Sequence, residues 1–446
     1  MADQIAFINL RPVWARAPLV LLAAAALYAS WYCVLWGFGS TMAETAPASY
    51  AADPAAALES AQAAARLSPN DPGTHLMVAR LSQLSFEPEG VERALREYAL
   101  AAELAPHDYL VWLEAGRARA ALGDREGGIK ALRRSVELAP HYSQPRWHLG
   151  NALLRNGETE EAFAELRRAA DADSNLRPQV FNLAWQVYGP DMARVIDVVG
   201  KTPQARAQLV GVLTGRGRLD DALAVWGGLG DAERRERPEA GLELARALYH
   251  HRRYHVALRT LRETGQAPPD LLPEKVYNGG FEGDIGKAGG AIFHWDVTHM
   301  PGVQMAIDAR TAAAGRRSLR LVFNASTQLN FANITQAVAV EPSTRYRLSY
   351  ALKTEELRSV ATLVVIPHDI TQLDVPLPGT TEIVPAPTGT NEWRHYAVEF
   401  TTGPATEAIL IRVLRVGCSE GSCPIYGKLW YDDFNLERVS GRPAAR

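Results

Sequence analysis

Hydrophobic residues follow three different patterns along this chain of 446 residues. No charged residue occurs from Ala17 to Met42. Residues 50–265 form short amphipathic stretches of 12 to 15 residues, with proline and glycine between them. After Gly265, apolar and polar residues alternate, as in Tyr346, Leu348 and Tyr350. These patterns predict a multidomain chain: an N-terminal transmembrane helix, an all-α array of short helices and an all-β sandwich.

The first pattern is long enough for a membrane. Leu19–Phe38 has Ser30 as its only strongly polar side chain, and twenty helical residues span about 30 Å, the thickness of a bilayer core. Trp31 and Trp36 lie near the end of the run, as in an interfacial aromatic belt. We predict a transmembrane helix over residues 18–38. The alternatives are a signal peptide cleaved near residues 41–43, and a buried core helix.

The charges on either side of this run predict its orientation. Arg11 and Arg16 precede it, whereas Glu44 and Asp53 follow it. The positive-inside rule therefore places residues 1–17 in the cytoplasm and the rest outside, in a single-pass protein of the inner (cytoplasmic) membrane with a periplasmic or extracellular bulk. The whole chain carries 47 basic and 50 acidic side chains, a net charge of -3, so no nucleic-acid partner is expected.

Three cysteines are too few for a disulfide framework. Export would bring Cys418 and Cys423 into an oxidising compartment, so we predict a disulfide between them. Two free thiols and half of a metal site are the alternatives. Cys33 lies in the membrane run and is read as a small apolar residue.

The helical part is internally repetitive. Glu-Leu-Ala-Pro occurs at residues 103–106 and again, 34 residues later, at 137–140. Residues 141–174 contain Gly150, Gly157 and Ala162 in the spacing of a helix pair, and the preceding unit has Gly128 at the position equivalent to Ala162. This region resembles the tetratricopeptide repeat family. The resemblance implies antiparallel helix pairs over residues 50–265, in a solenoid led by an unpaired helix at 54–67.

In that family the first helix of each pair lines a concave groove. The resemblance therefore places Arg117, Trp147, Asn151 and Arg155 on a groove that binds a protein partner. Arginine and asparagine side chains bind the carboxylate or backbone of an extended peptide. The alternative is a solvated helix face, with Trp147 in packing.

The last third opens and closes with characteristic segments. Residues 266–275 form a short proline-containing linker, and residues 276–439 form the sandwich. The sandwich begins with Asn-Gly-Gly-Phe-Glu at 278–282 and ends with Leu-Trp-Tyr-Asp-Asp-Phe at 429–434. These segments resemble the galactose-binding-like jelly rolls that serve as carbohydrate-binding modules. The resemblance implies a jelly-roll fold and polysaccharide as a candidate partner.

The same resemblance implies one structural site and one binding site. Family members often hold a structural calcium between two carboxylates that match Glu282 and Asp432, and no other cofactor is expected. A capped loop and a solvent-facing acidic pair are the alternatives. Sugar binding needs aromatic faces and planar polar groups, for which the candidates are Trp295, Arg347 and Trp430. The alternative for both tryptophans is the core.

Catalytic signatures are weak. Glu355–Glu356 and Asp432–Asp433 are adjacent strand residues that point to opposite faces, so neither pair converges on a glycosidic bond. His294, Asp296 and His299 are the best remaining acid-base or metal candidates, against a plain loop. We expect a membrane-anchored, non-enzymatic scaffold of the cell envelope that acts in surface polysaccharide assembly or export. The alternatives are a protein-only adaptor and a carbohydrate-active enzyme.

Overall fold

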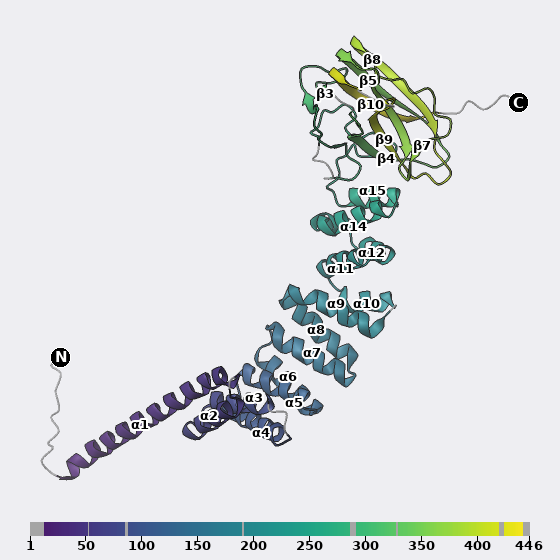
Figure 1. Cartoon of the computed structure of the whole chain (residues 1–446). Coiled ribbons are helices and arrows are strands. Elements are labelled where there is room, and N and C mark those ends of the chain that lie inside the picture. Colours follow the sequence, from purple (N-terminus) through teal and green to yellow (C-terminus); the bar gives the residue numbers. More distant parts are fainter. Residues whose placement is uncertain are drawn as a thin grey trace, which may run out of the picture. The chain divides into compact units, whose positions relative to one another are not determined.

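The computed structural model describes residues 13–51, 53–84, 88–189, 191–285, 291–326, 329–418 and 423–439. Residues 1–12 of the predicted cytoplasmic segment therefore lie outside the described residues. The chain divides into two compact units, Met1–Val199 and Gly200–Arg446, and each is described by itself (Figure 1).

The first unit consists of helices that pack in antiparallel pairs, α1 with α2, α3 with α4, α5 with α6, α7 with α8 and α9 with α10. They are α1 (Val13–Tyr50), α2 (Pro54–Leu67), α3 (Pro72–Leu84), α4 (Pro88–Leu104), α5 (Tyr109–Ala121), α6 (Arg125–Leu138), α7 (Ser143–Asn156), α8 (Thr159–Ala172), a 3-10 turn (Ser174–Leu176), α9 (Arg177–Tyr188) and α10 (Met192–Val199). Their first turns are capped locally: the Asp53 carboxylate accepts from Ala56 N at 3.0 Å, and Asp124 accepts from Gly127 N at 3.0 Å.

Glycines set the spacing within the pairs. A Cβ atom on Gly150 would lie 2.6 Å from Leu166 Cγ, so α7 and α8 approach closely only because that position is glycine. In the preceding pair a Cβ on Gly128 would lie 2.8 Å from Ala120 N and 3.0 Å from Gly116 O. Two facing glycines therefore replace the usual glycine and alanine, and α5 and α6 pack backbone to backbone.

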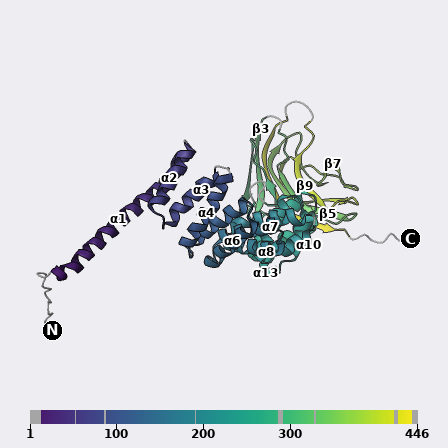
Figure 2. The same cartoon turned by 90° about the horizontal axis from the view of Figure 1, so that it is seen from below.

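Helix α1 contains the whole predicted transmembrane segment and continues beyond it. Its most apolar window has a mean hydropathy of 1.9 and is not buried, so by length and composition it can cross a membrane, as a signal sequence can. Its C-terminal half packs on α2, where Ala43 and Ala46 are buried. The leading helix α2 is therefore paired, unlike the prediction. Figure 2 shows α1 running out from the α2 end of the helical repeats as one helix.

The second unit begins with helices and ends in a sandwich. The helices are α11 (Pro203–Gly215), α12 (Leu219–Gly227), α13 (Asp231–Glu236), α14 (Pro238–His250) and α15 (Tyr254–Glu263). The strands are β1 (Asp296–Val297), β2 (Val303–Asp308), β3 (Ser318–Ala325), β4 (Ile334–Ala339), β5 (Arg345–Arg358), β6 (Leu363–Asp369), β7 (Gln372–Pro376), β8 (Gly389–Thr401), β9 (Ala408–Arg415) and β10 (Ile425–Arg438).

The strands form two antiparallel five-stranded sheets, in the orders β1-β4-β9-β6-β7 and β2-β3-β10-β5-β8. Alternating residues of β5, such as Tyr346, Leu348 and Tyr350, enter the core between the sheets, where they meet Ile409 and Ile411 of β9. The predicted fold class, a helical part with an apolar N-terminal helix followed by a β-sandwich, is confirmed.

The segment between α15 and the sandwich is firmly held. Glu274 N donates to Ala339 O at 2.8 Å, and the Glu274 carboxylate accepts from Tyr346 Oη at 2.6 Å and Arg438 Nε at 2.7 Å. Burial raises the pKa of Glu274, but these two bonds outweigh it and leave the pKa below its usual value. His255 Nε2 of α15 lies 2.9 Å from Val340 O. Helix α15 therefore packs directly on the sandwich.

The stability of the α3–α4 pair should depend on pH through His75. Its Nδ1 lies 2.6 Å from Glu97 Oε2 and its Nε2 lies 2.9 Å from Pro69 O, so only the doubly protonated ring donates to both acceptors. The bond to Glu97 raises the pKa of His75 above 6.5, against the effect of burial. Because the folded-state pKa of His75 is raised, protonation of the ring stabilises the folded state. This stabilisation is complete below the unfolded-state pKa and is lost as the pH rises through the folded-state pKa.

We therefore expect hydrogen exchange of the α3 and α4 amides to show an opening free energy that falls above pH 6.5. Glu97→Gln should remove this pH dependence and cost about 1.5 kcal/mol at lower pH. An unchanged slope in Glu97→Gln would show that another group titrates.

Candidate functional site

The four predicted groove residues line one cavity of the first unit. Arg117 of α5 and Trp147, Asn151 and Arg155 of α7 surround a volume of about 390 Å³. Asn151 Nδ2 donates to Trp147 O one helical turn earlier, at 2.8 Å, which fixes its amide against α7. Trp147 is half-buried, so part of its ring faces the cavity. The structure thus brings together residues from two neighbouring first helices.

The charges of this cavity are unequal. Glu114 is the acidic residue of its lining, and it already contacts two cations: its Oε1 lies 3.4 Å from Arg117 Nη1, and its Oε2 lies 3.5 Å from Arg80 Nε. Arg155 is exposed and has no ion pair among the described residues. Burial, followed by the nearby Arg117, lowers the pKa of His148, so this ring is neutral near pH 7. Two guanidinium groups, Arg117 and Arg155, therefore share the lining with one carboxylate, which Arg80 contacts as well.

Sequence reasoning missed several residues of this cavity. Glu114 and His148 lie 34 residues apart, and so do Arg117 and Asn151. The 34-residue period places each pair at equivalent positions of successive first helices, so repeat spacing could have identified Glu114 and His148 from Arg117 and Asn151. Repeat spacing could not have identified Tyr98, which lies on α4 rather than on α5 or α7. Its hydroxyl donates to Gln83 Oε1 at 3.3 Å, and burial raises its pKa to about 12.

A larger hollow, about 1030 Å³, lies over the second helices α4 and α6. Its arginines are compensated: Arg133 Nη2 lies 2.9 Å from Glu161 Oε2, and Arg134 Nη1 lies 2.9 Å from Glu137 Oε2. Because these two arginines are already paired, this surface is less suited to an anionic ligand than the cavity around Arg117.

The predicted sugar-binding tryptophans lie in the protein interior. Trp295 is 3% exposed, contacts Phe281 and Phe434, and donates from Nε1 to Asn278 O at 3.2 Å. Trp430 is 4% exposed and donates to Asp308 Oδ2 at 2.9 Å. Neither ring offers an open face for stacking on a sugar, which corrects the prediction. The physical reason is that Trp295 packs against two phenylalanine rings, whereas Trp430 is covered and bonded to Asp308 of β2.

Of the three predicted glycan contacts, only Arg347 is exposed. It lies on β5, with Glu399 of β8 and Glu437 of β10 as its register neighbours. This basic side chain therefore sits in an acidic strip of the sheet rather than beside the tryptophans.

The predicted calcium ligands hold a loop instead. Asp432 is fully buried, and its Oδ2 accepts from Ala313 N at 2.7 Å and Ala314 N at 3.0 Å. Glu282 Oε1 accepts from Arg316 N at 2.6 Å and Arg317 N at 3.0 Å. A calcium ion needs neighbouring oxygens, whereas these carboxylates are surrounded by N–H donors. The residues therefore do not fit calcium and instead fix residues 313–317 to the sandwich.

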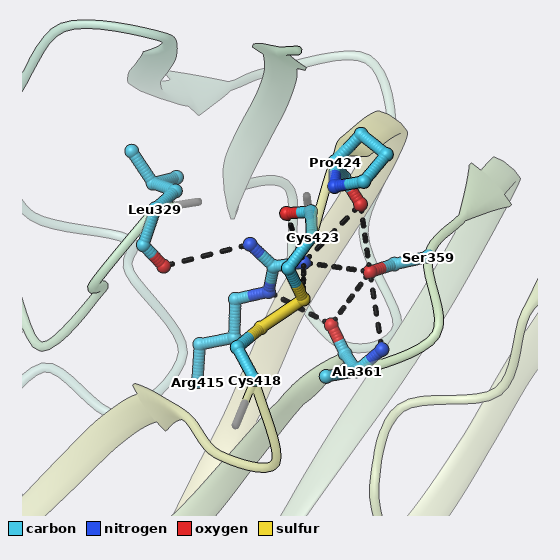
Figure 3. The surroundings of a disulfide bond; sticks show 7 residues. All are labelled: Leu329, Ser359, Ala361, Arg415, Cys418, Cys423 and Pro424. Atoms are coloured by element: carbon cyan, nitrogen blue, oxygen red, sulfur yellow. Dashed lines mark hydrogen bonds between the residues drawn. A yellow bond between two sulfur atoms is a disulfide. The ribbon is translucent and has the colours of Figure 1, made fainter. Parts of the chain in front are cut away.

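Cys418 and Cys423 form a disulfide, and Arg415 lies beside it, 9% exposed (Figure 3). The guanidinium donates to Ala361 O at 2.8 Å, Ser359 Oγ at 2.7 Å and Cys423 O at 3.0 Å. Its partners in Figure 3 are carbonyl, hydroxyl and sulfur atoms rather than a carboxylate. Burial lowers the pKa of Arg415. The arginine thus joins β9, the β5–β6 connection and the start of β10.

The three candidate catalytic residues have different surroundings. His294 is half-buried against the Tyr277 ring, and burial lowers its pKa. Asp296 accepts from Thr298 Oγ1 at 3.4 Å, and His299 is exposed. Within the described part of the chain, no group of three or more histidine, cysteine, aspartate or glutamate side chains is placed to hold a metal ion.

Comparisons with solved structures find partial similarities of low identity. "MamA 41-end from Desulfovibrio magneticus RS-1" is 16% identical, with 36% of this chain and 92% of that chain covered and a TM-score of 0.31. "CBM4 structure and function" is 13% identical, covering 37% and 99%, with a TM-score of 0.28. "Structure of TmCBM61 in complex with beta-1,4-galactotriose" is 20% identical, covering 39% and 100%, with a TM-score of 0.26.

No family model and no curated protein matches the chain.

Proposed function

We propose that this chain is a non-enzymatic scaffold, held in a membrane by α1, whose helical repeats bind an acidic, extended segment of a partner protein. The observation that carries the proposal is the excess of guanidinium groups in the cavity around Arg117 and Arg155. The bulk of the chain lies on the far side of the cytoplasmic membrane, because Arg11 and Arg16 precede the apolar run of α1.

Membrane insertion accounts for the exposed side chains of α1. Leu21 is 70% exposed and Leu22 is 66% exposed, and their neighbours along the helix are apolar as well. Such a continuous apolar surface is unfavourable in water and favourable in lipid. Cleavage as a signal peptide near residue 43 would remove Gly39, which packs against Ala64 and Ser68 at the end of α2, and the Leu35 and Trp36 carbonyls that accept from Ser68 Oγ. The packing therefore supports an uncleaved anchor.

The chemistry of the cavity favours a carboxylate-bearing peptide. Guanidinium groups bind carboxylates in a planar, two-bond geometry, and Arg117 and Arg155 come from adjacent first helices. The half-buried Trp147 offers an apolar surface in the same lining. An extended acidic segment that crosses α5 and α7 would therefore contact both cations and the indole ring.

For the sandwich we propose protein contact rather than stacking on sugar rings, because Trp295 and Trp430 are buried. We include the absence of turnover in the same proposal, which is supported by the fact that His294, Asp296 and His299 form no metal-binding group in the described residues. A role in surface polysaccharide assembly or export remains the hypothesis suggested by the pairing of an envelope anchor with these two domain types.

Selection of binding peptides tests the proposed groove. A library of random linear peptides displayed on phage would be selected on the full chain in lipid nanodiscs, with empty nanodiscs as the control. We expect the enriched peptides to be rich in aspartate and glutamate, and to compete with one another for one site. Enrichment of basic or purely apolar peptides would contradict the proposed ligand.

A further inference from the structure

The contact between α1 and the α2–α3 turn overlaps the apolar run of α1. Ser68 Oγ donates to Leu35 O at 3.3 Å and to Trp36 O at 3.2 Å. Asn70 Nδ2 donates to Tyr32 Oη at 3.3 Å. The polar turn at residues 68–71 therefore lies against the last part of the very segment that is apolar enough to cross a membrane.

The fit is close enough to fix this arrangement. Gly39 of α1 is buried, and a Cβ atom there would lie 2.3 Å from Ser68 Oγ. One residue further, Ser40 Oγ donates to Asp71 Oδ2 at 2.5 Å. Helix α1 then continues without a break to Tyr50. No hinge lies between the membrane segment and the first helices of the repeat unit, so the two move together.

The remaining sides of this part of α1 are apolar and open. Val34 is 63% exposed and Phe38 is 60% exposed. If the membrane ended before Tyr32, the immersed helix from Arg16 would be only about 24 Å long, and these side chains would face water. Immersion to Phe38 gives about 33 Å, enough to cross a bilayer core, and covers them with lipid.

We propose that the α2–α3 turn, residues 68–71, lies in the lipid headgroup layer of the membrane that α1 crosses. The inference rests on the proposed anchoring and adds to it that the repeat unit is seated on the bilayer surface at a fixed angle. The exposed Arg66, at the end of α2, is then within reach of lipid phosphates. The short polar side chains of the turn suit the headgroup layer, where water and polar groups remain available.

Depth-dependent fluorescence quenching tests whether the α2–α3 turn lies in the headgroup layer. The full chain with Cys33→Ala would receive one exposed cysteine, either Pro69→Cys at the α2–α3 turn or Arg125→Cys at the start of α6. Each would be labelled with bimane without reductant, so that the Cys418–Cys423 disulfide stays intact. The labelled chain would be placed in phosphatidylcholine vesicles that carry a nitroxide on the lipid headgroup.

We expect the label at position 69 to be quenched severalfold more than the label at position 125. A second turn position, Arg66→Cys, should report the same depth and guards against a local effect of replacing the proline. Equal, weak quenching at 66, 69 and 125 in a chain that floats with the vesicles would overturn the inference but not the anchor. A chain that fails to float with the vesicles would overturn the anchor, and the inference with it.

Discussion

Reversing the charges of Arg117 and Arg155 together is expected to reduce the affinity for acidic peptides by at least about a hundredfold. Each guanidinium lies in the cavity lining, where an anionic ligand is partly shielded from water and the effective dielectric constant is below that of bulk solvent. Two attractive contacts become repulsive in Arg117→Glu with Arg155→Glu. A combined loss of about 3 kcal/mol corresponds to rather more than two decades of affinity.

The measurement is fluorescence anisotropy of a selected acidic peptide with the full chain in nanodiscs. A matched control replaces Arg125 and Arg194, two exposed arginines of the same unit that lie outside the cavity lining, by glutamate. The control changes the net charge equally and should weaken binding only slightly, in a way that added salt removes. Equal losses in both double variants would show that the effect is global charge, and would reject the groove.

Replacing Gly279 by alanine is expected to destabilise the sandwich by about 3 kcal/mol or more. An added Cβ atom would lie 2.0 Å from Phe434 O and 3.0 Å from Phe434 C. These are backbone atoms of β10, and Phe434 N also donates to Gly279 O at 2.9 Å, so no flexible side chain can give way. Overpacking of this kind usually costs 1 to about 3 kcal/mol, and the displaced backbone bond adds to it.

The neighbouring glycine provides the control. A Cβ on Gly280 would lie 3.7 Å from Asp432 Oδ1 and 3.9 Å from Glu282 Cγ, which are ordinary contacts. Gly280→Ala should therefore change stability by no more than about 0.5 kcal/mol. Hydrogen exchange of the β5 and β10 amides in the full chain measures both variants. Similar protection of these amides in Gly279→Ala and Gly280→Ala would show that the backbone around Gly279 can shift to accept a Cβ atom, contrary to the prediction.

Periodicity in the sequence predicted the classes of structure well. The family resemblance that the 34-residue repeat carries placed Arg117 and Asn151 on one groove, and both line one cavity because equivalent residues of stacked helix pairs share a face. Alternation along residues 345–352 predicted which side chains of β5 enter the core, and Tyr346, Leu348 and Tyr350 do so. Both patterns repeat many times, so single exceptions do not obscure them.

Burial of individual residues could not be predicted in the same way. Trp430 lies on the face of β10 that periodicity assigns to the outside, yet it is covered and bonded to Asp308 of β2. That contact joins residues 122 positions apart. The N–H groups that surround Asp432 likewise come from a distant loop. A single sequence carries no periodic signal for such contacts. The family resemblance therefore predicted a calcium ion at Asp432, where backbone amides bind the carboxylate instead.

The junction at Glu274 has a mechanical consequence. One backbone bond to Ala339, two side-chain bonds to Tyr346 and Arg438, and the contact of His255 with Val340 all join the helical end of the second unit to its sandwich. A torque on the sandwich would be shared by all of these bonds. Helices α14 and α15 would therefore turn together with the sandwich. A partner that pulls on the sandwich would therefore exert force on the adjacent helices, with no slack tether to absorb it.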